Sequence, residues 1–274
     1  MPLARRSWLF VPGADESAHQ AAARSGADVI ILELEDFTPP ALRPRARALS
    51  GAAFARWRKS GAIAGVRINP LETGGVDDLA GIERPDVLMM SKVATPEEVQ
   101  RLEAAAPPGL ELVPNIESAA GLVRTLEIAR ASRRVSALLV ASEDMVADLG
   151  TERSRDGAEL AYVRSRFLVE CRAAGVEAID CPYTFSDLKG ALADARYAKR
   201  LGYRMKSVVD PSHVKAINAV FTPSARELAR ARKIVAAFDR ARAAGRDRAK
   251  VHGALVEVPI YAAAKRLLAS VARS

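Results

Sequence analysis

Two acidic residues each follow an apolar run in this chain of 274 residues. Glu117 follows the run 111–116, and Asp144 follows the run 136–141. A pair of carboxylates with few other strong ligands suits a hard cation such as Mg²⁺, which prefers oxygen ligands and keeps several of its waters. The three histidines show no metal-ligand spacing, which argues against a zinc or iron site built on histidine. The pair therefore predicts a Mg²⁺ site.

A third candidate is Arg67, which lies near the end of the apolar run 63–68. Beside a metal ion, its guanidinium could hold a substrate carboxylate through two hydrogen bonds or stabilise a negatively charged oxygen. The structural alternative is a salt bridge to Glu35 or Asp36, which end the preceding run. Arg67 can bind substrate and form a salt bridge at the same time.

Other catalytic patterns have less support. Lys92 follows the run 87–91 and could form a Schiff base, but nothing near it explains a lowered lysine pKa. The chain has no glycine-rich dinucleotide motif after a strand, no phosphate-binding P-loop and no Gly-x-Ser-x-Gly nucleophile motif.

These residues belong to a series of polar residues that end apolar runs. Successive members are separated by 25 to 36 residues, which is enough for one helix and one buried strand each time. This spacing predicts an α/β fold, a (β/α)₈ TIM barrel, whose active site lies at the carboxyl ends of the strands. For any single member, the alternative is a charge that merely ends a strand. The series is Asp36, Arg67, Lys92, Glu117, Asp144, Asp180 and Asp210.

The elements follow from the same pattern. Strands are expected at 7–11, 28–34, 63–68, 87–91, 111–116, 136–141, 176–179 and 206–209. Helices are expected from the N-cap Asp15 to 24 and at 43–59, 96–106, 118–131, 159–174, 187–201 and 211–220, with a polar loop at 148–156.

The barrel is expected to form one catalytic domain, 1–222, followed by a C-terminal helical extension, 223–274. The extension should contain a long helix at 224–244, an extended segment at 255–258 and a final helix at 259–271. It either packs on a neighbouring subunit or caps its own barrel, and the pattern alone leaves both open.

Composition limits the class of protein. No apolar stretch approaches the ~20 residues that span a bilayer, and the N-terminus lacks a signal-type segment, so we expect a cytoplasmic protein without a membrane partner. The chain has a net charge of +8, but its basic residues are scattered through Ala-rich helical stretches and aromatic residues make up only 5% of the chain, so we expect no nucleic-acid partner. The positive charge could attract an anionic substrate. Cys171 and Cys181 are expected to be buried thiols.

Several short motifs occur together and in order along the chain. They are Arg6-Ser7-x-Leu9-Phe10-Val11-Pro12-Gly13, Leu34-Glu35-Asp36, Val66-Arg67-Ile68-Asn69, Ile116-Glu117-Ser118-Ala119-x-Gly121-Leu122 and Asp180-Cys181-Pro182-Tyr183. With them the chain resembles the citrate lyase β-subunit-like group of the HpcH/HpaI aldolase superfamily, which is related to malyl-CoA and citramalyl-CoA lyases. The resemblance implies a metal-dependent barrel in which Glu117 and Asp144 bind Mg²⁺ and Arg67 contacts the substrate.

The resemblance also implies a homo-oligomer, a trimer or a hexamer. In the family, an Asp in a Val-Asp-x-Pro motif reaches the neighbouring subunit's site as an acid or base, and Glu257 occupies that position in this chain. Two further departures are Val209-Asp210-Pro211 in place of Ile-His-Pro, and Ala141-Ser142-Glu143-Asp144 where the family has a Gly before the metal-binding Asp.

Together, these features predict a Mg²⁺-dependent carbon–carbon lyase that cleaves or forms a 3-hydroxyacyl-CoA thioester. Its products are an acyl-CoA and a 2-keto acid. Arg67 would stabilise the developing charge, Glu257 would handle the proton, and Glu35 and Asp36 would orient Arg67 and the water around the ion. The alternatives are a CoA-independent pyruvate-type aldolase and a non-catalytic metal-binding subunit or small-acid sensor.

Overall fold

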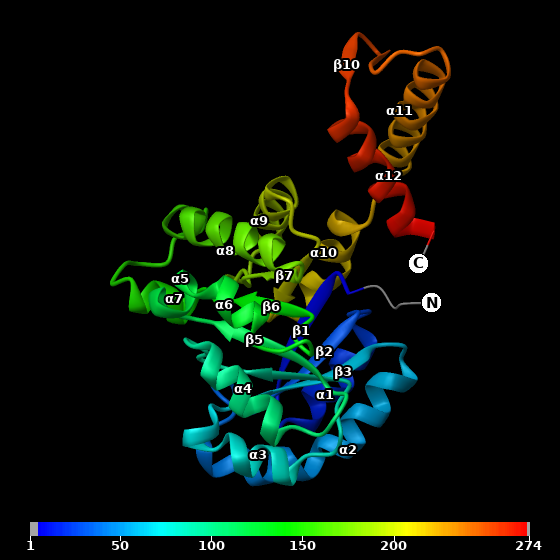
Figure 1. Ribbon diagram of the computed structural model, residues 1–274. Coiled ribbons are helices and arrows are strands. Elements are labelled where there is room, and N and C mark those ends of the chain that lie inside the picture. The colour runs from blue at the N-terminus through cyan, green and yellow to red at the C-terminus, as the bar shows by residue number, and fades with distance from the viewer. Residues whose placement is uncertain (1–4, 273–274) are drawn as a thin grey trace. The chain divides into compact units, whose positions relative to one another are not determined.

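The computed structural model describes residues 5–272, which fold into two compact units, one of residues 5–221 and one that begins at residue 222. In the first unit, eight parallel strands close into a barrel in sequence order, with β8 paired to β1 (Figure 1). This confirms the predicted (β/α)₈ barrel. The strands are β1 Ser7–Pro12, β2 Val29–Glu33, β3 Ile63–Ile68, β4 Val87–Met90, β5 Glu111–Ile116, β6 Ala137–Val140, β7 Glu177–Asp180 and β8 Met205–Val208.

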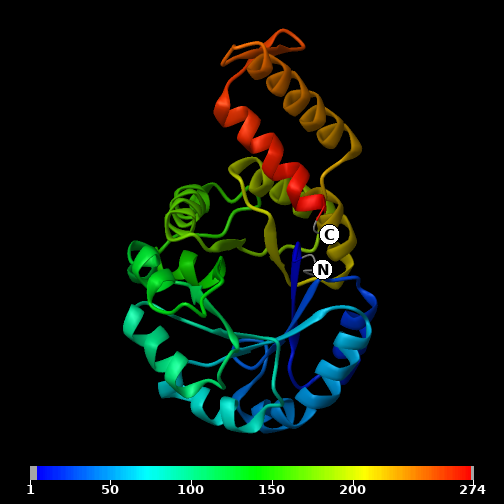
Figure 2. The same ribbon diagram turned by 45° about the vertical axis from the view of Figure 1, so that its right-hand side comes forward.

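Helices alternate with the strands and surround them (Figure 2). They are α1 Glu16–Arg24, α2 Arg43–Lys59, α3 Gly75–Gly81, α4 Pro96–Ala105, α5 Ala119–Val123, α6 Thr125–Arg130, α7 Glu143–Asp148, α8 Ala161–Ala174, α9 Leu188–Leu201 and α10 Val214–Phe221. Short 3₁₀ turns lie at Pro40–Leu42, Leu71–Thr73, Ala158–Leu160 and Pro211–His213. Asp15 caps α1 as predicted, because its carboxylate accepts hydrogen bonds from the backbone N–H groups of Ser17 and Ala18.

The barrel strands are apolar on both faces because both faces are buried. Side chains such as Trp8, Ile31 and Met89 fill the barrel interior, and the intervening residues pack on the helices. Residues two apart in a strand share a face. Gly65 of β3 faces the interior, where a Cβ atom would overlap the side chain of Ile31. By the same alternation, Arg67 points into the barrel near its carboxyl end.

Two helical predictions were wrong in detail. The single helix expected at 118–131 is two helices, α5 and α6, because the backbone of Arg124 (φ −112°, ψ 10°) leaves the helical region between them. The six-residue helix α7 was not predicted, since so short a segment shows no helical periodicity. Asp144 therefore lies in the first turn of a helix rather than in a loop after β6.

Asp180 does not lie at the mouth of the barrel, so its membership in the series of site candidates is corrected. Its neighbour Ile179 fills the barrel interior, so Asp180 points outward toward the helices. It forms ion pairs with Arg164 of α8 (2.7 Å) and Lys206 of β8 (2.6 Å). Asp194 of α9 contacts the same two cations at 2.7 and 2.5 Å. These four residues form a buried ion cluster between the sheet and the helices.

The second unit contains two helices and a hairpin. They are α11 Ala225–Ala243, β9 Ala249–Val251, β10 Ala254–Val256 and α12 Val258–Ala272. β9 and β10 pair antiparallel through the two-residue turn His252-Gly253, whose residues have φ of 50° and 79° and form a primed turn. Phe238 of α11 stacks on Tyr261 of α12 with ring centroids 4.6 Å apart, and these rings anchor a small core of the unit's own.

Two expectations from the sequence concern membrane-spanning helices and the two cysteines. Within residues 5–272, no helix is both long enough and apolar enough to cross a bilayer. Cys171 and Cys181 are free, buried thiols, as predicted. Burial raises the pKa of Cys181 to about 12, so this thiol stays protonated.

Candidate active site

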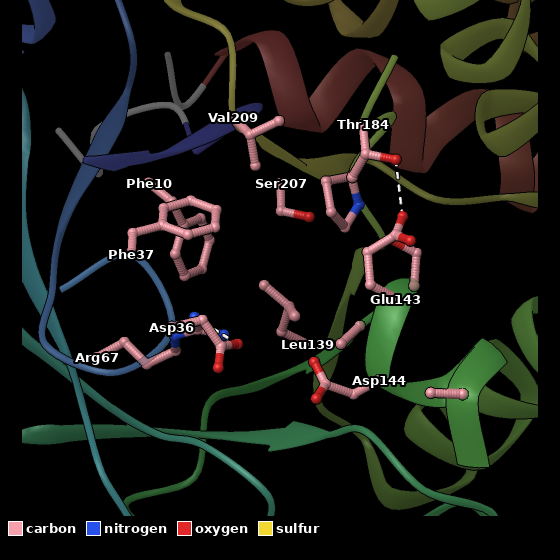
Figure 3. A pocket seen from close by; sticks show the side chains of 14 residues that line it. Phe10, Asp36, Phe37, Arg67, Leu139, Glu143, Asp144, Thr184, Ser207 and Val209 are labelled. Atoms are coloured by element: carbon pink, nitrogen blue, oxygen red, sulfur yellow. Dashed lines mark hydrogen bonds and ion pairs between the residues drawn. The ribbon is translucent and has the colours of Figure 1, made fainter. Parts of the chain in front are cut away.

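A cavity of about 430 Å³ lies at the carboxyl ends of the barrel strands (Figure 3). One part of its wall is apolar and contains Phe10, Phe37, Leu139, Pro182 and Val209. The other part is polar and contains Asp36, Arg67, Glu143, Asp144, Thr184 and Ser207. The cavity has the position that a barrel enzyme uses for catalysis, and it brings residues from six strand ends together.

Arg67 is held firmly at one side of this cavity. Its Nε donates to Oε1 of Glu33 at 2.8 Å, and one terminal nitrogen lies 3.2 Å from Glu35 and 3.4 Å from Asp36. The last two contacts confirm the predicted salt bridges. Burial by itself lowers the pKa of Arg67, but the charges of Glu33 and Glu117 raise the pKa well above its usual value, so the guanidinium stays positive.

Glu33 is a site residue that the sequence prediction missed. Its side chain is fully buried, and its two oxygens accept hydrogen bonds from the backbone N–H groups of Glu35 (2.8 Å) and Phe37 (2.6 Å). Glu33 thus fixes the loop after β2 as well as Arg67. The sequence signal that points to Glu33 is the alternation of faces along a strand, because Glu33 lies on the same inward face as Val29 and Ile31. The position directly after the apolar run points to Glu35 and Asp36 instead.

Glu117 is one of the buried polar side chains at this end of the barrel that lack a hydrogen-bond partner among the described residues. It is buried, and neither carboxylate oxygen has a hydrogen-bond partner among the described residues. Its nearest positive charge is a terminal nitrogen of Arg67, 3.6 Å away. Burial raises the pKa of Glu117 to about 8, with a further increase from the charge of Asp144, while Arg67 opposes the shift.

Asp144 lies across the cavity from Arg67 (Figure 3). Burial raises its pKa as well, and the nearby charge of Asp36 adds to the effect. Glu117 and Asp144 repel each other when both are ionised, and Glu117 has no hydrogen-bond partner among the described residues. Keeping both carboxylates ionised is therefore costly unless a cation lies between them.

The donor set fits a hard divalent cation. Within the described residues, no group of three His, Cys, Asp or Glu side chains gathers as a metal cluster. A cation between Glu117 and Asp144 would therefore rely on water and substrate oxygens for its remaining ligands, which is the usual coordination of Mg²⁺. The unpartnered oxygens of Glu117 supply the vacant acceptors that such an ion needs.

Lys92 takes part in the polar network as a charge partner. Its Nζ lies 2.5 Å from Oε1 of Glu35, and its backbone has a φ of 55°, which is uncommon for a residue other than glycine. The hydrogen bond to Glu35 raises the pKa of Lys92, so the amine is protonated and unsuited to attack a carbonyl. This agrees with the sequence analysis, in which a Schiff base at Lys92 has less support than a metal site.

Glu143 links two loops at the opposite side of the cavity. Its carboxylate accepts a 2.7 Å hydrogen bond from the hydroxyl of Thr184 and lies 3.4 Å from Nε of Arg153 (Figure 3 shows the first contact). Glu143 is adjacent to Asp144 on α7, so these contacts also fix the helix that carries Asp144.

Glu257 belongs to the second unit, whereas the other five residues of the predicted site belong to the barrel. It directly precedes α12, its side chain is 54% exposed, and it lies 3.8 Å from Arg248 of the same unit. The structure thus brings Arg67, Glu35, Asp36, Glu117 and Asp144 together in the barrel, and the role of Glu257 stays a prediction.

Comparison with known proteins identifies the family. The profile of the family described as HpcH/HpaI aldolase/citrate lyase matches residues 6–211. The citrate lyase subunit beta of Escherichia coli strain K12 is 32% identical over 280 residues, which cover 96% of this chain and 92% of that protein. The (3S)-malyl-CoA thioesterase of Cereibacter sphaeroides is 30% identical over 268 residues, which cover 96% of this chain and 93% of that protein.

A solved structure matches most of the chain. The protein CitE from Mycobacterium tuberculosis, in complex with magnesium, acetoacetate and coenzyme A, superposes with a TM-score of 0.79 at 28% identity and covers 97% of both chains. The profile match and the relatives lead to the same conclusion as the motifs quoted from the sequence. The chain belongs to the HpcH/HpaI aldolase/citrate lyase family of lyases.

Proposed function

We propose that the protein is a Mg²⁺-dependent lyase for a 3-hydroxyacyl-CoA thioester of the citryl-, malyl- or citramalyl-CoA type. The reaction breaks the bond between the hydroxyl-bearing carbon and the carbon next to the thioester. It yields an acyl-CoA and a 2-keto acid, and it can run in either direction. Family membership supports this reaction class, and the relatives named above act on related molecules or bind them.

One observation carries the proposal. A buried carboxylate, Glu117, which has no hydrogen-bond partner among the described residues, lies 3.6 Å from an immobilised guanidinium, Arg67, at the mouth of a barrel. Asp144 lines the same cavity. This arrangement combines a cation site with a fixed donor for a negatively charged substrate oxygen, and the proposed bond cleavage requires both.

Each residue has a distinct proposed role. Glu117 and Asp144 would hold Mg²⁺, which when bound polarises the hydroxyl and carboxylate oxygens of the substrate. The terminal nitrogens of Arg67 donate to the oxygen that becomes the keto group, while Glu33, Glu35 and Asp36 keep the guanidinium in place.

The carbon next to the thioester must gain a proton during cleavage and lose one during synthesis. The barrel residues at the cavity are committed to the cation and to Arg67, and Lys92 is paired with Glu35. We assign the proton to Glu257, supplied from a neighbouring copy of the chain, as the family resemblance implies.

The test is product analysis with purified protein and Mg²⁺. Citryl-, malyl-, methylmalyl- and citramalyl-CoA are each incubated, and mass spectrometry identifies the products in both directions. We expect at least one to give an acyl-CoA and a 2-keto acid, with Arg67→Lys more than about tenfold slower because lysine loses the planar fork.

The other outcomes point to different functions. Free coenzyme A with an intact hydroxy acid would mean thioester hydrolysis, the activity for which the Cereibacter relative is named. Cleavage of a free hydroxy-keto acid alone would favour the aldolase. Binding of keto acids without turnover of any substrate would favour a sensor or a non-catalytic subunit.

A further inference from the structure

Asn115 of β5 has a fully buried side chain to which the proposed function assigns no role. Neither its side-chain nitrogen, Nδ2, nor its oxygen, Oδ1, has a hydrogen-bond partner among the described residues. Burying a polar group without a hydrogen bond is costly, and buried polar groups in folded proteins nearly always have a partner, either in the protein or in ordered water. The amide of Asn115 therefore needs a partner from outside the chain.

This amide points into the barrel, beside the wall of the cavity. Residues two apart in a strand share a face, and Val113 belongs to the apolar cluster of the barrel interior, whereas Leu112 and Ile116 pack toward the helices. Asn115 is also directly paired with Leu139 of β6, whose side chain lines the cavity (Figure 3). The unpaired amide therefore lies next to the candidate active site.

Glu117 follows on the same side of β5, two residues further along the chain. It lies just beyond the end of the strand, 3.6 Å from Arg67, which also points into the barrel. Both carboxylate oxygens of Glu117 lack a hydrogen-bond partner in the part of the chain that the structure describes, as do both polar atoms of Asn115. The end of β5 thus carries two neighbouring buried side chains whose polar atoms are unpaired.

The unpaired atoms of these two side chains are complementary. Nδ2 of Asn115 is a donor, whereas an ionised Glu117 has only acceptors. No direct hydrogen bond joins the two, so a water that accepts from Nδ2 and donates to Glu117 is the simplest link. Buried waters typically make about three hydrogen bonds to polar groups that otherwise lack partners. Oδ1 of Asn115 remains an acceptor, and a water bound to a cation is a donor.

A purely structural role for this amide has no contact to support it. The backbone C=O of Asn115 accepts a 3.0 Å hydrogen bond from the backbone N–H of Val93, and any residue at position 115 could provide that link. Its inward-facing neighbours Val113 and Leu139 are apolar. An apolar side chain would pack against them without an unpaired polar group, so packing alone does not explain an asparagine here.

We propose that Asn115 is a positioning residue for the cation site. Through one buried water, its Nδ2 fixes a carboxylate oxygen of Glu117, and its Oδ1 accepts a hydrogen bond from a water of the bound cation. This inference rests on the proposed function, because it takes Glu117 as a ligand of Mg²⁺. Residues of this kind orient the ligands of a metal, and loss of one typically lowers metal affinity about 10- to 100-fold.

The experiment compares Asn115→Val with Asn115→Thr in calorimetric titrations of the full-length protein with Mg²⁺, without substrate. Valine and threonine have almost the same shape and both suit a strand, but only threonine keeps a group that donates and accepts hydrogen bonds. Circular dichroism verifies folding, and Asn115→Leu is a second apolar variant in case Asn115→Val does not fold. Val113→Ala is the matched control, because it disturbs packing on the same face of the same strand, two residues earlier.

We expect Asn115→Val to bind Mg²⁺ about tenfold more weakly or worse, and Asn115→Thr to stay within about threefold of the unmodified protein. Val113→Ala should change the affinity less than about twofold. If Asn115 had only a structural role, the valine variant would change the free energy of unfolding in urea and leave Mg²⁺ affinity unchanged. That result, or equal weakening of Mg²⁺ binding in the valine and threonine variants, would overturn the proposal.

The two proposals fail in different ways. Mg²⁺ binding requires no turnover, so the role of Asn115 can be confirmed even if no thioester reacts. If Glu117→Gln leaves Mg²⁺ binding unchanged, the proposed cation site is wrong and the role of Asn115 is wrong with it. If Glu117→Gln abolishes Mg²⁺ binding while Asn115→Val does not weaken it, the cation site stands and only the role of Asn115 is wrong.

Discussion

Glu33 and Arg67 occupy directly opposed positions on the neighbouring strands β2 and β3, and Oε1 of Glu33 accepts a 2.8 Å hydrogen bond from Nε of Arg67. The other oxygen of Glu33 accepts from the backbone N–H of Phe37 at 2.6 Å. One buried carboxylate therefore fixes both the guanidinium and the loop that carries Asp36. If the guanidinium or the loop were displaced, Arg67 and Asp36 would change position relative to each other in the cavity.

The first prediction follows from this relationship. Glu33→Gln should lower kcat by about tenfold or more with a smaller effect on KM, because a neutral amide cannot accept from Arg67 and Phe37 together and the guanidinium loses its fixed position. Steady-state kinetics with the reactive thioester measure the effect, and Glu16→Gln, a surface carboxylate, is the control. If Glu33 acts through Arg67, the losses in Glu33→Gln and Arg67→Lys should not add, and additive losses would contradict that role.

The barrel was predictable because its signals are local and repeated. β3, β5 and α2 match their expected bounds, since buried strands of six residues and an uninterrupted helix leave clear apolar patterns. The same logic failed at α7, which is too short for a pattern. It also misplaced Asp180, because the residue that ends an apolar run faces the helices when its neighbour fills the barrel.

The candidate site was predictable in part. The sequence points to Arg67, Glu117 and Asp144 because they lie near or shortly after the ends of apolar runs, which is where barrel chemistry lies. Glu33 was missed because its partner lies 34 residues away, and the pairing register that joins them is not visible in the sequence.

The second prediction concerns the cation. Glu117→Gln and Asp144→Asn should each abolish Mg²⁺ binding in calorimetric titrations while the barrel stays folded, because the pair provides the charged ligands of the proposed site. Glu143→Gln is the matched control on α7, and it should retain binding. Undiminished Mg²⁺ binding in both ligand variants would remove this pair from the site, and loss of folding would indicate a structural role.

The third prediction concerns assembly. We expect a symmetric homo-oligomer, a trimer or a hexamer, in which the C-terminal unit presents Glu257 to a neighbouring subunit. Inactive Glu257→Ala and inactive Arg67→Ala subunits, mixed under conditions that allow exchange, should then regain part of the activity, since some sites receive both intact residues. Light scattering reports the oligomeric state. A monomer, or no regained activity after verified exchange, would argue against a shared site.

The fourth prediction concerns stability against pH. Burial favours the protonated form of Asp194, but the charges of Lys206 and Arg164 outweigh it and hold the pKa at about 2, below the usual 3.8. Because the folded-state pKa is lowered, the contribution of Asp194 is complete above about pH 4 and is lost as the pH falls toward 2; its size is about 2 kcal/mol.

Urea unfolding at pH 7 and pH 3 tests this contribution. Asp194→Asn should destabilise the protein by about 3 kcal/mol at pH 7, because it leaves buried cations underpaired, and the deficit should shrink at pH 3. Asp187→Asn, a more exposed carboxylate that caps α9, provides a comparison outside the ion cluster. An Asp194→Asn deficit of the same size at both pH values would show that the ion cluster does not depend on this ionisation.

The last prediction concerns the keto acid. Arg67 is the one cation among the residues that line the barrel cavity, and Phe10, Leu139 and Val209 form part of an apolar wall. A keto acid with one carboxylate can meet the cation site and place an apolar substituent on that wall, whereas the second carboxylate of oxaloacetate would face Asp36 or Glu143. In the presence of Mg²⁺, we therefore expect pyruvate and 2-ketobutyrate to bind about tenfold more tightly than oxaloacetate in calorimetric titrations.

Glu143→Gln removes one carboxylate from the wall and should reduce this preference while leaving pyruvate affinity unchanged. Oxaloacetate that binds the unmodified protein as well as pyruvate does would show that a further cation, from outside the barrel cavity, completes the site.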